Sequence, residues 1–248
     1  MKKIIIASIC AMALSAVPAQ ANPQTEEVSE TVVVVEQQKK NSFMDGFFVA
    51  VGAGAQILFA DHDVRDSFGA RIAPAFDVYV GKWFNNSNNP IFGLRLGVTG
   101  FNVKGATKME NDPNYDSAHG TGVRTDELIK HGLQRQKFNY TNTHLDFMVN
   151  FSNLACRYCG PHVWNAIPYV GIGWVRSWSS NGAGPEFRPT HNDVSVNIGF
   201  LNAVRINEHL NINRDIHAMA TRDKFDGEEG GRKIDGILGV TAGVSWTF

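Results

Sequence analysis

The stretch Ile234–Phe248, which reads IDGILGVTAGVSWTF, decides the fold. Alternate residues from Ile234 onward are mostly apolar, whereas the residues between them are mostly small or polar. A period of two places these two sets on opposite sides of a β-strand, and a helix would distribute both around its circumference. The stretch is also longer than the roughly 9–11 residues that a tilted strand needs to cross a bilayer. Its apolar side ends in Trp246 and Phe248, as in the aromatic girdle of a membrane barrel.

The same alternation recurs upstream. We predict seven further strands, at residues 47–59, 75–84, 92–99, 144–151, 169–174, 194–200 and 210–220. The strand at 210–220 is irregular, because its apolar side also carries Arg214, so either this residue lies near the interface or a bulge shifts the register. The predicted fold class is therefore all-β, an eight-stranded antiparallel up-and-down transmembrane β-barrel.

The N-terminus has the pattern of an export signal. Met1-Lys2-Lys3 precedes an apolar stretch, and Ala19-Gln20-Ala21 is a small-x-small cleavage site. We predict a signal peptide at residues 1–21, a flexible periplasmic leader at 22–42 around the segment Val32–Val35, and an outer-membrane barrel at 43–248.

Charge and hydropathy exclude two classes of protein. The formal net charge is −1 and becomes −3 once Lys2 and Lys3 are removed, so a nucleic-acid partner is not expected. No run of eighteen apolar residues follows the signal, which leaves a closed barrel as the way to span a bilayer.

The predicted connections alternate in length. Segments 60–70, 104–136, 179–192 and 221–233 are mostly long and polar, whereas 84–90 and 207–209 are short. Outer-membrane barrels have long external loops and short periplasmic turns, so both termini are expected in the periplasm. Segment 152–165 is an exception, since it is too long for a simple turn.

With its strand pattern and its Val244-x-Trp246-x-Phe248 ending, the chain resembles the eight-stranded OmpA-like outer-membrane barrels, of the kind found in Bacteroidetes. The resemblance covers residues 43–248. It implies that the terminal strand is recognised by the barrel-assembly machinery, and that outer-membrane lipid and lipopolysaccharide surround the barrel. OmpA proteins continue into a peptidoglycan-binding domain, and this chain stops at the barrel, so we do not expect a role in cell-wall anchoring.

Four charged or titratable residues fall on inward faces of the predicted strands: Asp77, Arg95, His144 and Asp146. The interior of an eight-stranded barrel is just wide enough for side chains to fill. Unpaired charges in so narrow a space are costly, so we predict a paired polar network that plugs the lumen. The alternative is a narrow ion pathway that uses the same residues.

Cys156 and Cys159 form a C-x-x-C pair in segment 152–165. A thioredoxin-like site would need a βαβ setting, and a metal site has no further ligand nearby except His162. In an oxidising compartment we predict a disulfide between them.

Three residue pairs suggest enzymes. Asp61 with Asp63 and Asp215 with His217 are similar to the pairs of omptin-type proteases, but those barrels have ten strands; Ser117 with His119 suggests a lipid hydrolase. Short pairs of this kind arise readily by chance. We therefore predict a non-enzymatic outer-membrane protein without cofactor or metal, whose external loops have a structural or surface-interaction role toward an extracellular ligand or host surface. The alternatives are a low-conductance diffusion pore and, third, an outer-membrane enzyme.

Overall fold

The structure is a computed structural model that describes residues 44–60, 67–84, 90–108, 123–129, 133–155, 162–179, 190–223, 225 and 234–248. Its strands are β1 (Phe47–Phe59), β2 (Ala73–Phe84), β3 (Phe92–Lys108), β4 (Val123–Ile129), β5 (Leu133–Val149), β6 (Trp164–Ser179), β7 (His191–Arg205), β8 (Leu210–Arg222) and β9 (Ile234–Thr247). Its helices are α1 (Phe68–Arg71) and α2 (Phe151–Ala155). Neither of these short helices, in the part of the chain described, is long and apolar enough to cross a membrane.

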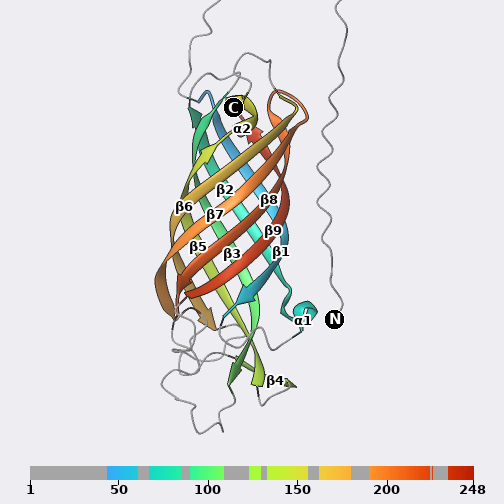
Figure 1. Cartoon of the computed structure of the whole chain (residues 1–248), viewed down its shortest axis with the longest axis vertical. Helices are drawn as coiled ribbons and strands as arrows, with labels where there is room; N and C mark the ends of the chain where they lie inside the picture. The colour runs from blue at the N-terminus through green and yellow to red at the C-terminus, as the bar shows by residue number, and fades with distance from the viewer. Residues whose placement is uncertain are drawn as a thin grey trace, which may run out of the picture. The chain divides into compact units, whose positions relative to one another are not determined.

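Eight of the strands close into a barrel (Figure 1). Each strand pairs antiparallel with its neighbour along the chain, except that β3 pairs with β5 rather than with β4. The terminal strand β9 pairs with both β8 and β1, from Phe48 opposite Thr247 to Phe59 opposite Gly236, and this closes the ring. The predicted class of an eight-stranded antiparallel up-and-down barrel is confirmed.

The two ends of the barrel differ. The loop end, at the bottom of Figure 1, carries α1, β4 and the C-terminal ends of β1, β3, β6 and β8. The turn end, at the top, carries α2, the bend at 206–209 and the terminal Phe248. Asn207 tightens that bend, because its Oδ1 accepts hydrogen bonds from the backbone N–H groups of His209 and Leu210.

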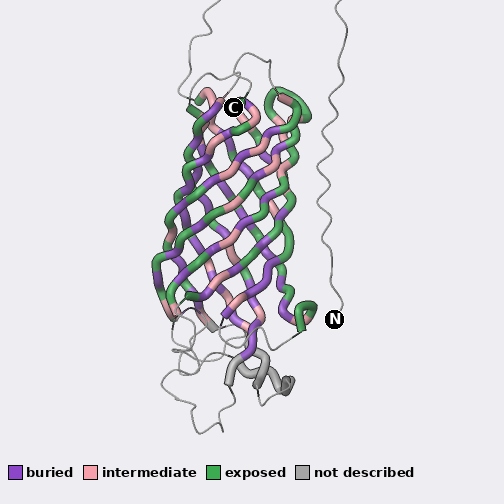
Figure 2. Tube along the Cα trace, viewed as in Figure 1, coloured by how far each residue is buried: buried purple, intermediate pink, exposed green. Residues whose placement is uncertain are grey.

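The alternation seen in the sequence becomes the two faces of the wall. Val240, Leu96 and Phe147 lie on the outer face and are 41%, 49% and 46% exposed, whereas Arg95 and Asp146 are almost fully buried inside. Figure 2 shows buried and exposed residues alternating along the strands around the barrel. An apolar outer face of this kind is suited to hydrocarbon, and it would be unfavourable in water.

The structure corrects the predicted strand lengths. The segment 104–136 is not one loop, because β3 runs on to Lys108, β4 lies within it, and β5 begins at Leu133. Lys137 pairs with Lys104 on one side and with Val123 on the other, so β3, β5 and β4 extend the sheet beyond the barrel rim. The sequence of this extension lacks the alternation that revealed the other strands.

The structure also explains two irregular features of the sequence, the long segment 152–165 and the outward Arg214. Segment 152–165 was too long for a turn because α2 occupies its start, with Phe151 in the helix rather than in a strand. Arg214 is exposed on the outer face, and β8 pairs without interruption with both β7 and β9, so no bulge displaces it. It lies four residues from the start of β8 at the turn end, where a charge on the lipid face costs little if the interface is near.

Candidate functional site

The candidate site is a charged layer inside the barrel, built around Arg95 of β3. The Arg95 side chain is 2% exposed, and its Nε donates a hydrogen bond to Asp146 Oδ2 of β5 at 2.7 Å. Its Nη1 donates to Asp215 Oδ2 of β8 at 3.2 Å, across the lumen. The guanidinium lies between two aromatic rings, 4.0 Å from the Tyr79 centroid and 3.9 Å from that of Tyr169. The ion pairs and the two ring faces together hold the cation in place.

Both carboxylates of the charged layer have a second partner. Asp146 Oδ1 lies 2.8 Å from His144 Nδ1, and Asp215 Oδ1 accepts a hydrogen bond from the Tyr169 hydroxyl at 2.9 Å. Each acid therefore uses both of its oxygens. This matters because a buried carboxylate without partners is strongly unfavourable.

Three of the four residues predicted for the lumen network thus lie in one set of contacts: Arg95, His144 and Asp146. Asp77 is also buried on the inner face of β2, but it hydrogen-bonds Thr241 of β9 and has no direct bond to Arg95. The residues that the sequence did not single out for this layer are Tyr79, Tyr169 and Asp215. Their inward positions follow from the alternation, but their convergence on Arg95 depends on the curvature of the wall.

Glycines on neighbouring strands make room for the large side chains of the lumen. A Cβ placed on any of these glycines would overlap the facing side chain. The pairs are Gly52 with Asp77, Gly97 with Tyr79, Gly171 with Asp146, Gly199 with Tyr169, and Gly239 with His217. In each pair the glycine is the direct cross-strand partner of the residue it accommodates. Large and small positions therefore alternate around the ring, as a narrow barrel requires.

Toward the loop end, the charged layer is followed by a neutral polar set. The amide of Asn142 donates to Asn197 Oδ1 at 2.7 Å, and the Ser195 hydroxyl donates to Asn142 Oδ1 at 2.7 Å. These side chains come from β5 and β7, and they meet over Gly173 of the intervening strand β6, so the hydrogen bonds bridge neighbouring strands along the inner wall.

An apolar cluster, the loop-end cap, closes the lumen beyond this polar set. It consists of Leu58, Ala60, Val103, Phe138, Tyr140, Val175, Met219, Phe225 and Ile237, each at most 4% exposed. Phe225 comes from the connection after β8, and its ring meets those of Phe138 and Tyr140 edge to face at 5.4 and 5.5 Å. The Ser177 hydroxyl donates to the carbonyl oxygen of Phe225 at 3.1 Å and fixes it there.

A second apolar layer lies on the other side of the charged layer. Phe48, Met148, Ile167, Leu201 and Ala203 are buried near the turn end, with Trp83 packed against them. The sequence-based expectation was a lumen of small and charged groups, and it missed both apolar layers. The sequence did indicate these layers, because Leu58, Phe138 and Met148 are large apolar residues at inward positions.

The residues considered for catalysis are distributed as follows. Asp215 and His217 are buried in the lumen, with Asp215 held by Arg95 and Tyr169. Asp61, Asp63, Ser117 and His119 lie outside the described residues, as do Cys156 and Cys159. Within the described ranges no three His, Cys, Asp or Glu side chains are grouped so as to hold a metal ion.

The closed wall, its apolar outer face and its filled lumen define an eight-stranded antiparallel transmembrane β-barrel, the fold of outer-membrane barrels. Over 240 residues, or 96% of its length, the chain is 26% identical to outer membrane protein 40 of Porphyromonas gingivalis, a member of the Bacteroidetes. The match covers 55% of that protein, so the chain spans about half the length of this curated relative. No family model matches the chain.

Two solved structures are similar in fold. Neisserial surface protein A has a TM-score of 0.45 and 11% identity, with 82% of this chain and 97% of that one covered. The outer membrane protein OprG of Pseudomonas aeruginosa has a TM-score of 0.44 and 10% identity, with 83% and 97% covered.

Proposed function

We propose that this chain is a sealed, non-enzymatic outer-membrane barrel that acts through the surface at its loop end. The observation that carries the proposal is the loop-end cap: Phe225 packs on Phe138 and Tyr140 inside the mouth of the barrel. The apolar side chains of the cap interrupt the lumen and offer no polar groups there to replace the water around an ion. The chain would therefore hold a rigid platform in the membrane rather than conduct.

The second candidate is a narrow diffusion pore, and one observation favours it. Several buried polar atoms of the middle lumen have no hydrogen-bond partner, namely Asp77 Oδ2, Tyr79 Oη, Arg95 Nη2, His144 Nε2 and His217 Nδ1. Such atoms are normally satisfied by water when a cavity admits it. Water in the middle of the lumen would form a pathway only if both apolar layers also opened, which is why we rank the pore second.

An enzymatic role is the third candidate. Asp215 and His217 are the only considered pair among the described residues, and they lie between the two apolar layers. Both oxygens of Asp215 are occupied by Arg95 and Tyr169, which leaves this carboxylate no free oxygen to activate water. We therefore assign the pair to the structure of the lumen.

The proposed surface role belongs to the loop end. There β3, β4 and β5 extend past the rim of the barrel, and α1 lies at the same end (Figure 1). We propose that this end faces the outside and that both termini are periplasmic. The partners would be an extracellular ligand or host surface at the loop end, outer-membrane lipid and lipopolysaccharide around the wall, and the barrel-assembly machinery at β9.

Single-channel recording in a planar bilayer tests the seal. We expect the refolded wild-type protein to give no steady current, and Phe225→Ala to give frequent openings because the cap loses its central ring. The matched control is Phe151→Ala, which removes the same group from an exposed position in α2, outside the lumen. Steady current through the wild-type protein would favour the pore instead.

Labelling of single cysteines in intact cells tests the orientation. In a chain carrying Cys156→Ser and Cys159→Ser, Thr190→Cys places a thiol at the loop end and Glu208→Cys places one at the turn end, both at exposed positions. A membrane-impermeant maleimide should label the first in intact cells and the second only after lysis. The opposite pattern would place the loop end in the periplasm.

A further inference from the structure

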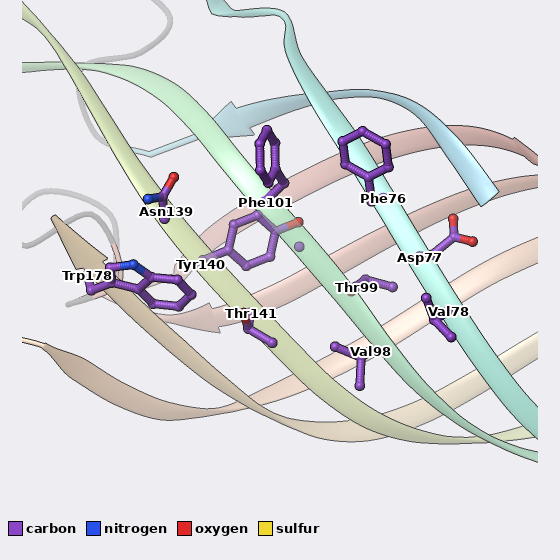
Figure 3. A pocket seen from close by; sticks show the side chains of 11 residues that line it. Phe76, Asp77, Val78, Val98, Thr99, Phe101, Asn139, Tyr140, Thr141 and Trp178 are labelled. Carbon is purple, nitrogen blue, oxygen red and sulfur yellow. The ribbon is translucent and has the colours of Figure 1, made fainter. Parts of the chain in front are cut away.

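The outer wall near the loop end carries a groove that the sealed-barrel proposal does not use. It has a volume of about 310 Å³ and lies over β2, β3, β5 and β6 (Figure 3). Phe76, Val78, Val98 and Phe101 supply most of its apolar lining, and all four side chains face outward. Gly100 and Thr141 lie between these four residues and Trp178. The groove is hollow there because glycine has no side chain and threonine has a small one.

The backbone departs from the regular strand pattern at this groove. Phe101 has a φ of 122°, the only positive φ of a non-glycine residue in the described chain. Its cross-strand partner Tyr140 points into the lumen, whereas the Phe101 ring points outward and meets Phe76 edge to face at 5.2 Å. A backbone conformation of this kind costs roughly 1–3 kcal/mol and persists where the surroundings hold it. At this position it puts one more aromatic ring on the lipid face.

A second hollow adjoins the apolar groove. It has a volume of about 670 Å³, shares Thr141 and Trp178 with the groove, and contains Arg176 with Thr190 and Asn192. Arg176 is directly opposite Thr141 on β5 and Asn192 on β7, so a polar row crosses three strands. Trp174 and Trp178 flank Arg176 on the same face of β6. Among the described residues no carboxylate pairs with this exposed guanidinium.

We propose that the groove and the adjoining hollow form one binding site for a phosphorylated glycolipid, lipid A in an outer membrane. An acyl chain would lie along Phe76 and Phe101, and a phosphate would bind Arg176, which offers a planar pair of donors. The hollow is too large for a phosphate alone. Its hydroxyl and amide groups and its two tryptophan faces suit a sugar headgroup, which is the reason to prefer a glycolipid over a phospholipid.

Native mass spectrometry of the refolded protein in detergent tests this site. The probes are bisphosphorylated lipid A, the same lipid without phosphates, and phosphatidylglycerol. We expect one lipid A to be retained, and retention to fall at least about tenfold when the phosphates are removed or when Arg176→Gln removes the cation. Heat-modifiable gel mobility would show that each variant folds. We expect Arg176→Gln to fold, because Arg176 is exposed on the outer face.

Two matched controls keep the test specific. Arg214→Gln removes an outward arginine from the turn end of the barrel wall and should leave retention unchanged. Val98→Trp fills the groove without touching Arg176 and should weaken retention, whereas Val240→Trp on β9 should not. Equal loss with Arg176→Gln and Arg214→Gln would overturn the site, and so would equal retention of phosphatidylglycerol and lipid A. The channel recordings are independent of this result.

Discussion

The charged layer and the loop-end cap occupy the same lumen and close it by different means. In the charged layer, Arg95 joins strands β3, β5 and β8 through Asp146 and Asp215, so every contact depends on a partner of the right charge in the right place. In the cap, Phe225 and Phe138 need only shape and apolar surface. The charged layer therefore fixes the arrangement of the strands, whereas the cap contributes stability and excludes water.

The largest effect that would distinguish the two regions comes from removing the central cation. Arg95→Met leaves Asp146 and Asp215 facing the same space, and we expect a loss of about 3–5 kcal/mol in the free energy of unfolding, as for other broken buried pairs. Urea titration of the protein in lipid vesicles, followed by tryptophan fluorescence, measures it.

The control uses the ion pair between Arg222, whose side chain is 81% exposed, and Asp193, which is 9% exposed; Arg222 Nε lies 3.8 Å from Asp193 Oδ1. Arg222→Met should cost at most about 1 kcal/mol, because solvent screens an exposed pair. A cost for Arg95→Met no larger than this would show that the charged layer is hydrated and that its charges are not truly buried.

A smaller effect compares one hydroxyl in each region. The Tyr140 hydroxyl donates to Gln56 Oε1 beside the cap, while the Tyr79 hydroxyl in the charged layer has no partner. Tyr140→Phe leaves a buried amide oxygen unsatisfied and should cost about 1 kcal/mol. Tyr79→Phe should cost less or stabilise slightly. The same vesicle titration applies, and equal costs would mean that an ordered water serves Tyr79.

The sequence predicted the faces of this barrel well, because a period of two survives wherever one side of a strand meets lipid. Leu96 and Val98 lie outward and Arg95 lies inward, as their alternation indicated. The sheet extension formed by β3, β4 and β5 was missed for the same reason: past the membrane neither face needs to be apolar, and the period disappears.

The partners inside the lumen could be predicted only in part. Arg95 and Asp146 are direct cross-strand neighbours, which a correct register is enough to place together. Asp215 is 120 residues from Arg95 and lies on a strand that does not touch β3, so its approach depends on how the wall curves around the lumen. Phe225 enters the cap from a connection, and connections carry no periodic signal. The apolar layers were missed because polar groups were expected on every inward face.

A small net effect on stability is expected from neutralising the whole charged centre at once. Arg95→Met combined with Asp146→Asn and Asp215→Asn removes the cation together with the two carboxylates that it binds, so neither carboxylate is left as an unpaired charge. Replacing a complete buried ion network is often neutral or stabilising, whereas breaking it is not, and we expect the triple variant to lie within about 1–2 kcal/mol of the wild type. His144 and Tyr169 can still hydrogen-bond the two asparagine side chains.

We expect the triple variant to refold less well than the wild type, with a lower yield of heat-modifiable barrel. The reason is that the strands lose the contacts that select one strand arrangement over others. A triple variant as unstable as Arg95→Met alone would show that the ion pairs themselves stabilise the barrel, and the division of roles between the charged layer and the cap would then be wrong.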